Sequence, residues 1–139
     1  MTIQIKLLND KAIMPTRGTE HSASFDLYAP ERVDIPAGQS YLVGTGLAMA
    51  IPNGWFGQVN PRSSIASKKK VRVGARIVDS DYRGEVFINL HNDSDMTYEI
   101  QKGDRIAQIV FIQFMSDVAQ VDDLDNTERG EGAFGSTGV

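Results

Sequence analysis

The C-terminal segment 129–139 carries residue types that suit phosphate binding. Its glycines leave the backbone free to turn N–H groups toward an anion: Gly130, Gly132, Gly135 and Gly138. A guanidinium, two hydroxyls and an aromatic ring accompany them: Arg129, Ser136, Thr137 and Phe134. Such a segment cannot bury enough apolar surface to fold alone. We expect a mobile arm that closes over a ligand with phosphates and a flat ring; the alternative is a disordered terminus.

The segment 78–85 is dense in groups capable of proton transfer. Asp79 follows the apolar pair Ile77-Val78, so a strand or hairpin could hold its carboxylate at a partly dry position. A carboxylate there can accept a proton from water, as a general base does. The same residues, from Asp79 to Gly84, are typical of a hairpin turn. The two interpretations are compatible.

Two hydroxyls stand at the start of the one predicted helix, residues 63–69. Ser63 or Ser64 could serve as the N-cap of that helix. The same helix start offers N–H groups to a phosphate, and Arg62 favours this anion-binding interpretation. The run Lys68–Lys70 is expected to be a solvated face.

Two polar residues interrupt apolar segments. Asp26 lies in the predicted strand 25–29, where its propensity is poor. It either binds the water shell of a magnesium ion or faces solvent on a sheet edge. Gln108 lies in the apolar run 106–111, where a buried amide needs partners from the backbone or a ligand.

Composition excludes several classes of protein. A length of 139 residues suits one domain, and a net charge of −4 argues against broad binding to nucleic acid or an anionic membrane. No cysteine and two histidines exclude disulfides and thiolate chemistry and disfavour a multi-histidine metal site. No apolar run suits a membrane span or a signal peptide, so we expect a soluble cytoplasmic protein.

The elements that must position these groups are predicted to be short strands. Alternating or apolar runs bounded by turn residues predict strands at 3–7, 25–29, 33–35, 41–51, 55–59, 86–91, 98–100 and 106–114. Gly44 and Gly46 indicate a bulge or bend within 41–51. Many short strands predict an all-β sandwich, jelly roll or barrel. Exposed sheet edges and a detachable tail favour an oligomer in which arms cross between subunits.

Taken together, these segments resemble the trimeric dUTP nucleotidohydrolase (dUTPase) family along nearly the whole chain. The five motifs of that family match, in order, residues 23–29, 61–66, 74–85, 102–108 and 129–138. The resemblance implies a jelly-roll-like β core over residues 1–125 and a flexible arm over 126–139. It also implies a homotrimer with active sites between subunits.

The implied reaction is hydrolysis of dUTP to dUMP and pyrophosphate, with Mg²⁺ held mainly by the triphosphate. Asp79 matches the residue that orients the attacking water and meets the sugar 3′-hydroxyl. Tyr82 matches the residue whose ring packs under the deoxyribose and excludes a 2′-hydroxyl. Asp26 matches the residue that holds magnesium through water. The alternatives are a dCTP deaminase-related enzyme and a non-catalytic nucleotide-binding module.

The resemblance assigns the remaining site residues to the phosphates and the base. Phosphate-contacting or site-organising positions match Arg62, Ser63, Ser64 and Gln108, of which Arg62 and Gln108 join Asp79 as catalytic. In the arm, Arg129, Ser136 and Thr137 would hold the γ-phosphate, and Phe134 would stack on uracil. The backbone of a hairpin near residues 74–82 could read the uracil edge. Substrate-binding positions also include Gly74, Val78 and Gly135.

Three residues depart from the family pattern by replacing a usual glycine. Ser24 does so in the first motif, Arg76 in the third and Ala133 in the arm. Ala133 is expected to limit positive φ there. The side chain of Arg76 either points away from the base pocket or alters the affinity or specificity of the site.

Overall fold

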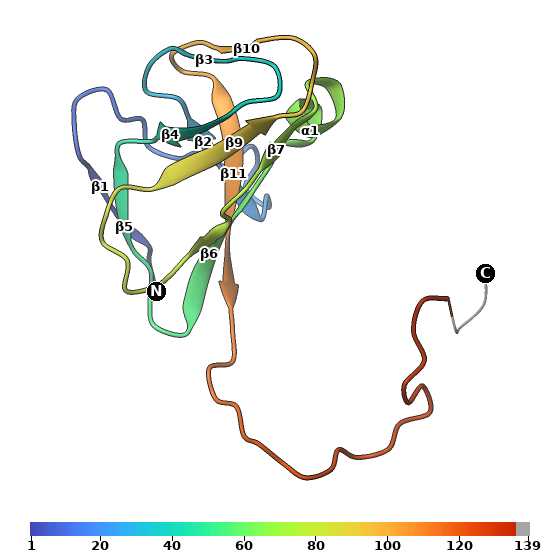
Figure 1. Cartoon of the computed structure of the whole chain (residues 1–139). Coiled ribbons are helices and arrows are strands. Elements are labelled where there is room, and N and C mark those ends of the chain that lie inside the picture. The colour runs from blue at the N-terminus through green and yellow to red at the C-terminus, as the bar shows by residue number, and fades with distance from the viewer. Residues whose placement is uncertain (136–139) are drawn as a thin grey trace.

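The structure is a computed structural model and describes residues 1–135, which form eleven β-strands and one short helix. The strands are β1 (Gln4–Leu7), β2 (Ser24–Tyr28), β3 (Val33–Ile35), β4 (Ser40–Gly44), β5 (Leu47–Ala50), β6 (Trp55–Asn60), β7 (Val71–Val73), β8 (Ile77–Val78), β9 (Phe87–Asn92), β10 (Tyr98–Ile100) and β11 (Arg105–Gln113). The helix is α1 (Ser63–Lys68). The predicted all-β, jelly-roll-like fold is confirmed (Figure 1).

All strand pairs are antiparallel, and the longest strand lies inside the largest sheet. The strand orders are β2-β11-β6-β8, β4-β9-β7, β1-β5 and β10-β3. The predicted central strand is therefore β11, whose Ile106, Ala107 and Ile109 are fully buried. In β9, Ile88 and Leu90 are buried at alternate positions, as their period of two predicts. These side chains belong to one hydrophobic core.

The predicted stretch 41–51 forms two strands because the chain bends at Gly46. That residue has φ +71°, a left-handed conformation that side-chain-bearing residues rarely adopt. A Cβ added there would also lie 2.8 Å from Cβ of Ala12. The bend turns β5 toward β1, with which it pairs.

Two short strands lie where the local sequence pattern is weak. No strand was predicted for β7, and Ile77-Val78 was predicted only to begin a strand or hairpin. Both are defined by their partners, since β7 pairs with β9 and β8 pairs with β6. The helix ends at Lys68, one residue earlier than predicted.

The C-terminal segment leaves the sandwich at the end of β11. The N–H of Phe114 donates to the carbonyl of Gly54 at 3.0 Å, and residues 113–131 are exposed. From there the chain extends away from the body (Figure 1). The boundary between core and arm at residues 125 and 126 stays a prediction. Within residues 1–135, the helix is too short to cross a membrane.

The core position Ile109 offers a test of the packing. Its Cδ1 lies 2.8 Å from where a Cβ on Gly57 would stand, so the side chain fills the space above that glycine. Ile109→Ala should lower the free energy of unfolding by about 2–5 kcal/mol, because it leaves a cavity at the sheet centre. Chemical denaturation at fixed protein concentration measures this. The control Val118→Ala, at an exposed position, should change it by less than about 0.5 kcal/mol. A similar effect of both substitutions would contradict the placement of Ile109 in the core.

Candidate functional site

Three polar residues are cross-strand neighbours in the four-stranded sheet. Gln108 of β11 is opposite Asp26 of β2 on one side and opposite Asn60 of β6 on the other. Directly opposed residues project from the same face of a sheet, with Cβ atoms about 5 Å apart. Asp26 and Gln108, both predicted site residues, thus lie side by side. Asn60 is a member that sequence reasoning missed, although polar Gln58 and Asn60 alternate with buried residues in β6.

The carboxylate of Asp26 is buried between two guanidinium groups. Nε of Arg62 lies 3.5 Å from Oδ1, and Nε of Arg105 lies 3.8 Å from Oδ2. The side chain of Asp26 is only 10% exposed, so of the two alternatives the one in which it faces solvent is wrong. Although β2 is an edge strand, its edge is covered, because the N–H of Asp26 donates to the carbonyl of Thr16 at 2.7 Å. The two cations offset the cost of burying the charge.

The Nε group of Arg62 is buried and has no hydrogen-bond partner within residues 1–135. Its contact with Asp26 is an ion pair without hydrogen-bond geometry. Buried N–H groups in proteins are almost always bonded, because an unpaired donor loses its water without compensation. The position therefore suits an acceptor from a ligand, and a guanidinium favours an anionic one.

The helix that follows Arg62 begins without a side-chain cap. Arg62 itself is the N-cap residue, in an extended conformation, and Ser63 is the first helical residue. The interpretation of Ser63 or Ser64 as a capping residue is therefore wrong. Both serines are exposed and follow directly after Arg62, whose Nε is buried. The run Lys68–Lys70 is exposed, as predicted.

A cleft of about 1090 Å³ lies beside this group. Arg62 and Ser64 line it from the start of α1, and Tyr98 and Arg105 line it from β10 and β11. Burial raises the pKa of Tyr98, and the Asp104 carboxylate raises it further, while Arg62 lowers it. The tyrosine thus stays a neutral hydroxyl, in a cleft that Arg62 and Arg105 line with positive charge.

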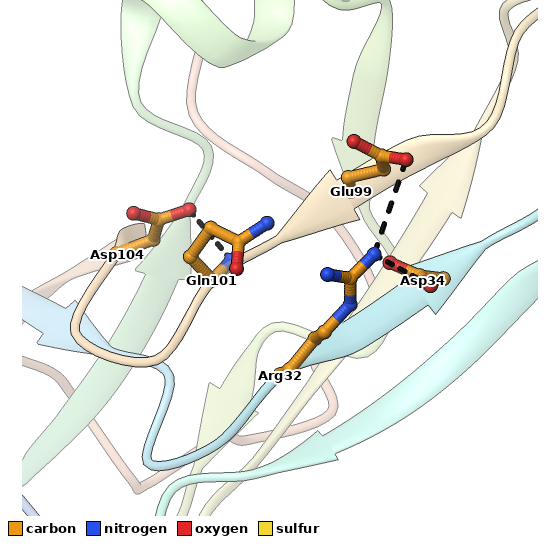
Figure 2. Close-up of polar contacts among 5 residues, drawn as sticks. All are labelled: Arg32, Asp34, Glu99, Gln101 and Asp104. Carbon is orange, nitrogen blue, oxygen red and sulfur yellow. Dashed lines mark hydrogen bonds and ion pairs between the residues drawn. The ribbon is translucent and has the colours of Figure 1, made fainter.

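The turn between β10 and β11 is closed by its own carboxylate. Oδ2 of Asp104 accepts a hydrogen bond from the N–H of Gln101 at 2.8 Å, and the glycine between them has φ +86° (Figure 2). Beside it, Arg32 reaches Asp34 at 3.2 Å and Glu99 at 3.9 Å, across the pair β3 and β10. The Asp104 contact thus lies at the start of β11, the strand that carries Gln108.

The third motif forms the predicted turn. The N–H of Tyr82 donates to the carbonyl of Asp79 at 3.2 Å, and Oη of Tyr82 donates to the carbonyl of Glu85 at 2.7 Å. A Cβ added at Gly84 would lie 2.6 Å from that Oη, so only glycine lets the ring lie against the backbone. The turn therefore holds the ring of Tyr82 in place. Asp79 is exposed, so the partly dry position expected for it is absent within one chain.

The third motif lies apart from the group around Arg62. Val78 is opposite Gly57 of β6, whereas Gln108 is opposite Asn60, three residues further along that strand. At the usual rise this separation is about 10 Å, and Asp79 lies beyond Val78. Gly74 is bound elsewhere, to the carbonyl of Asn89 at 2.8 Å. One chain thus does not bring all predicted site residues together.

The side chain of Arg76 lies along β6. Its Nε donates to the carbonyl of Val59 at 3.0 Å, and its Nη2 donates to Oδ1 of Asn60. Its own carbonyl accepts from the N–H of Val59 at 2.8 Å. The guanidinium therefore points toward the row of Asp26, Gln108 and Asn60.

The arm lies apart from both groups of its own chain (Figure 1). Nε of Arg129 donates to the carbonyl of Gly132 at 2.8 Å, and Phe134 is fully exposed. Positive φ occurs at Gly130, Phe134 and Gly135 but not at Ala133, so the alanine fits its position. The predicted residues Ser136 and Thr137 lie outside the described residues.

Comparisons with known proteins agree on one family. The family model described as dUTPase matches residues 10–138. The deoxyuridine 5′-triphosphate nucleotidohydrolase of Arabidopsis thaliana is 45% identical over 137 residues, covering 98% of this chain and 82% of the relative. A mutant dUTPase of Staphylococcus bacteriophage 80alpha with dUpNHpp superposes with a TM-score of 0.92 at 30% identity, covering 99% of each chain.

A second solved structure is similar over a shorter length. A mutant dUTPase from phage phi11 of S. aureus has a TM-score of 0.81 at 27% identity, covering 88% of this chain and 98% of its own. That structure is described as revealing how a structural Mg(II) ion is coordinated.

Proposed function

The chain belongs to the dUTPase family, and from that premise we propose that it hydrolyses dUTP to dUMP and pyrophosphate by attack of an oriented water on the α-phosphorus. The observation that carries the proposal is the buried Nε of Arg62, which lacks an acceptor beside Asp26 within residues 1–135. A phosphate oxygen supplies that acceptor. Cleavage of a phosphoanhydride depends on charge neutralisation and an aligned nucleophile more than on covalent catalysis.

The phosphate-binding group comes from strands β2 and β11 and the start of α1. Arg62 supplies a half-buried cation, and Gln108 supplies an amide in the same row as Asp26. Ser63 and Ser64 add exposed hydroxyls next to the cation. These donors stand in place before substrate arrives, so they need little rearrangement to stabilise charge on the phosphates.

The nucleoside is bound by the third motif. Asp79 accepts a hydrogen bond from the attacking water and, as general base, takes its proton while meeting the 3′-hydroxyl of the sugar. The ring of Tyr82 is held by Glu85 and Gly84, so it forms a fixed wall under the deoxyribose with no room for a 2′-hydroxyl. The backbone between Gly74 and Val78 reads the uracil edge.

The site is completed by assembly into a homotrimer. The phosphate-binding group, the third motif and the arm lie apart on one chain. Each active site therefore combines these three parts from different subunits. The exposed ring of Phe134 stacks on uracil, and Gly135 provides the turn beside it with φ +91°. Nε of Arg129 is used within the arm, which leaves its terminal N–H groups for the γ-phosphate together with Ser136 and Thr137.

Magnesium fits this site as an ion held mainly by the triphosphate. No group of three or more metal-binding side chains occurs within residues 1–135, so this part of the chain offers no metal cage of its own. Asp26 is a lone carboxylate whose contacts are ion pairs, which leaves its lone pairs able to accept from metal-bound water. Bound there, the ion would neutralise phosphate charge. The predicted cytoplasmic location stays a prediction.

Pyrophosphate release from a panel of nucleotides tests the substrate. We expect dUTP to be turned over at least about 100-fold more efficiently than dCTP, dTTP or UTP, because the fixed ring and backbone reject other sugars and bases. Chelation of Mg²⁺ should lower the rate for dUTP. Equal rates for dUTP and UTP would contradict the role of Tyr82, and ammonia release from dCTP would favour the deaminase alternative.

Asp79→Asn tests the orientation of water. The amide keeps the shape of the side chain but cannot take a proton, so kcat should fall about 10²- to 10⁴-fold with little change in KM. The matched control is Asp81→Asn, in the same exposed turn, which should keep the wild-type rate. Unchanged turnover by Asp79→Asn at saturating dUTP would refute its catalytic role.

Removal of residues 129–139 tests the arm. We expect kcat/KM for dUTP to fall on the order of 100-fold, because closure positions the triphosphate and excludes water. The melting temperature should be unchanged, since the arm extends away from the body (Figure 1). The substitution Phe134→Ala isolates the stacking contribution, and Phe134→Trp should restore most of it. Full activity of the truncated protein would rule out the proposed closure.

A further inference from the structure

We propose that Arg76 is a positioning residue that orients Asn60, so that the Asn60 amide joins the phosphate-binding group as a further donor to an anionic oxygen. The inference deepens the proposed function and rests on it for the location of the phosphates. It concerns Asn60, which stands just before the second motif, and Arg76, which stands in the third motif at a position where the family usually has glycine.

The first step is that Arg76 is fixed on β6. Its carbonyl accepts from the N–H of Val59 at 2.8 Å, and its Nε donates to the carbonyl of Val59 at 3.0 Å. One residue thus binds both main-chain polar groups of Val59, which is itself buried. Glycine at position 76 could make the first contact but has no side chain for the second. The guanidinium is therefore anchored before it reaches Asn60.

The second step is that this anchor determines which way the Asn60 amide points. A guanidinium carries only donors, so the group that it contacts must be the amide oxygen. Nη2 of Arg76 accordingly donates to Oδ1 of Asn60. The NH₂ group of the amide is then turned away from Arg76. Within residues 1–135 it makes no hydrogen bond, so both of its N–H donors are available.

The third step is the position of Asn60 in the sheet. It is directly opposite Gln108, which is directly opposite Asp26, so the three side chains form one row on one face. Arg62, with its unpaired buried Nε, follows Asn60 by two residues. A donor at Asn60 thus stands beside the amide and the cation that the proposed function assigns to phosphate. Without Arg76 the amide could turn over and present its oxygen, which repels a phosphate.

A double-mutant cycle tests this coupling with dUTP as substrate. We expect Arg76→Ala and Asn60→Ala each to lower kcat/KM about tenfold, and the double variant to be within about twofold of Asn60→Ala alone. Arg76→Lys should recover most of the loss, because an ammonium also only donates and so orients the amide the same way. If the losses of the two single variants multiplied in the double variant, the proposal would be overturned. Failure of Arg76→Lys to recover activity would overturn it as well.

Binding of pyrophosphate provides a readout that does not depend on turnover. By calorimetry, Arg76→Ala should weaken pyrophosphate binding about five- to tenfold. The matched control Arg72→Ala removes an exposed arginine whose partner is instead a carboxylate, that of Asp93 at 2.6 Å, and should leave binding unchanged. Equal pyrophosphate affinity of wild type and Arg76→Ala would overturn the inference even if dUTP hydrolysis is observed. Absence of dUTP hydrolysis by the wild type would instead refute the proposed function. If Arg76→Ala does not fold, Asn60→Ala should weaken pyrophosphate binding by the same five- to tenfold, and wild-type affinity of that variant would overturn the inference.

Discussion

The pairing of β11 with both β2 and β6 is the constraint on which the candidate site depends. Asp26, Asn60 and Gln108 are far apart in sequence, and only the register of these two ladders sets them in one row. That register is fixed by the hydrophobic core, because a slip of one residue would turn Ala107 and Ile109 outward and Gln108 inward. The stability of the sandwich and the geometry of the site therefore depend on the same strand register. A change that loosens the core should also displace the row.

The buried carboxylate of Asp26 gives the row its electrostatic character. Two guanidinium groups compensate its charge at ion-pair distances, yet neither satisfies it with a close hydrogen bond. The Nε of Arg62 is left without an acceptor within residues 1–135. Such an arrangement is costly for folding alone and advantageous for binding, since donors already in place need no reorganisation when an anion arrives. The local cost is tolerated because the surrounding strands hold every member of the group in position.

The division of functional residues over one chain makes assembly part of the proposed chemistry. The turn that holds Tyr82 lies about 10 Å or more along β6 from the row, and Phe134 extends into solvent on the arm. A monomer would bind parts of a nucleotide without aligning water and phosphorus. Arg76 connects two of these groups within a chain, since it belongs to the third motif in sequence and contacts Asn60 in space. The arginine that replaces the usual glycine there thus directs its side chain toward the proposed phosphate-binding group.

The sequence by itself determined the strand-rich fold, the central position of β11, the turn at Asp79 and the family, because these depend on local periodicity, turn chemistry and ordered motifs. It also identified Asp26, Arg62 and Gln108 as residues with unusual surroundings. Tertiary structure alone decided that Asp26 is buried, that Ser63 does not cap α1, that β7 is a strand, and that Asn60 and the side chain of Arg76 join the row. The physical reason is that cross-strand register and the direction of a long side chain depend on partners distant in sequence, which no local pattern specifies.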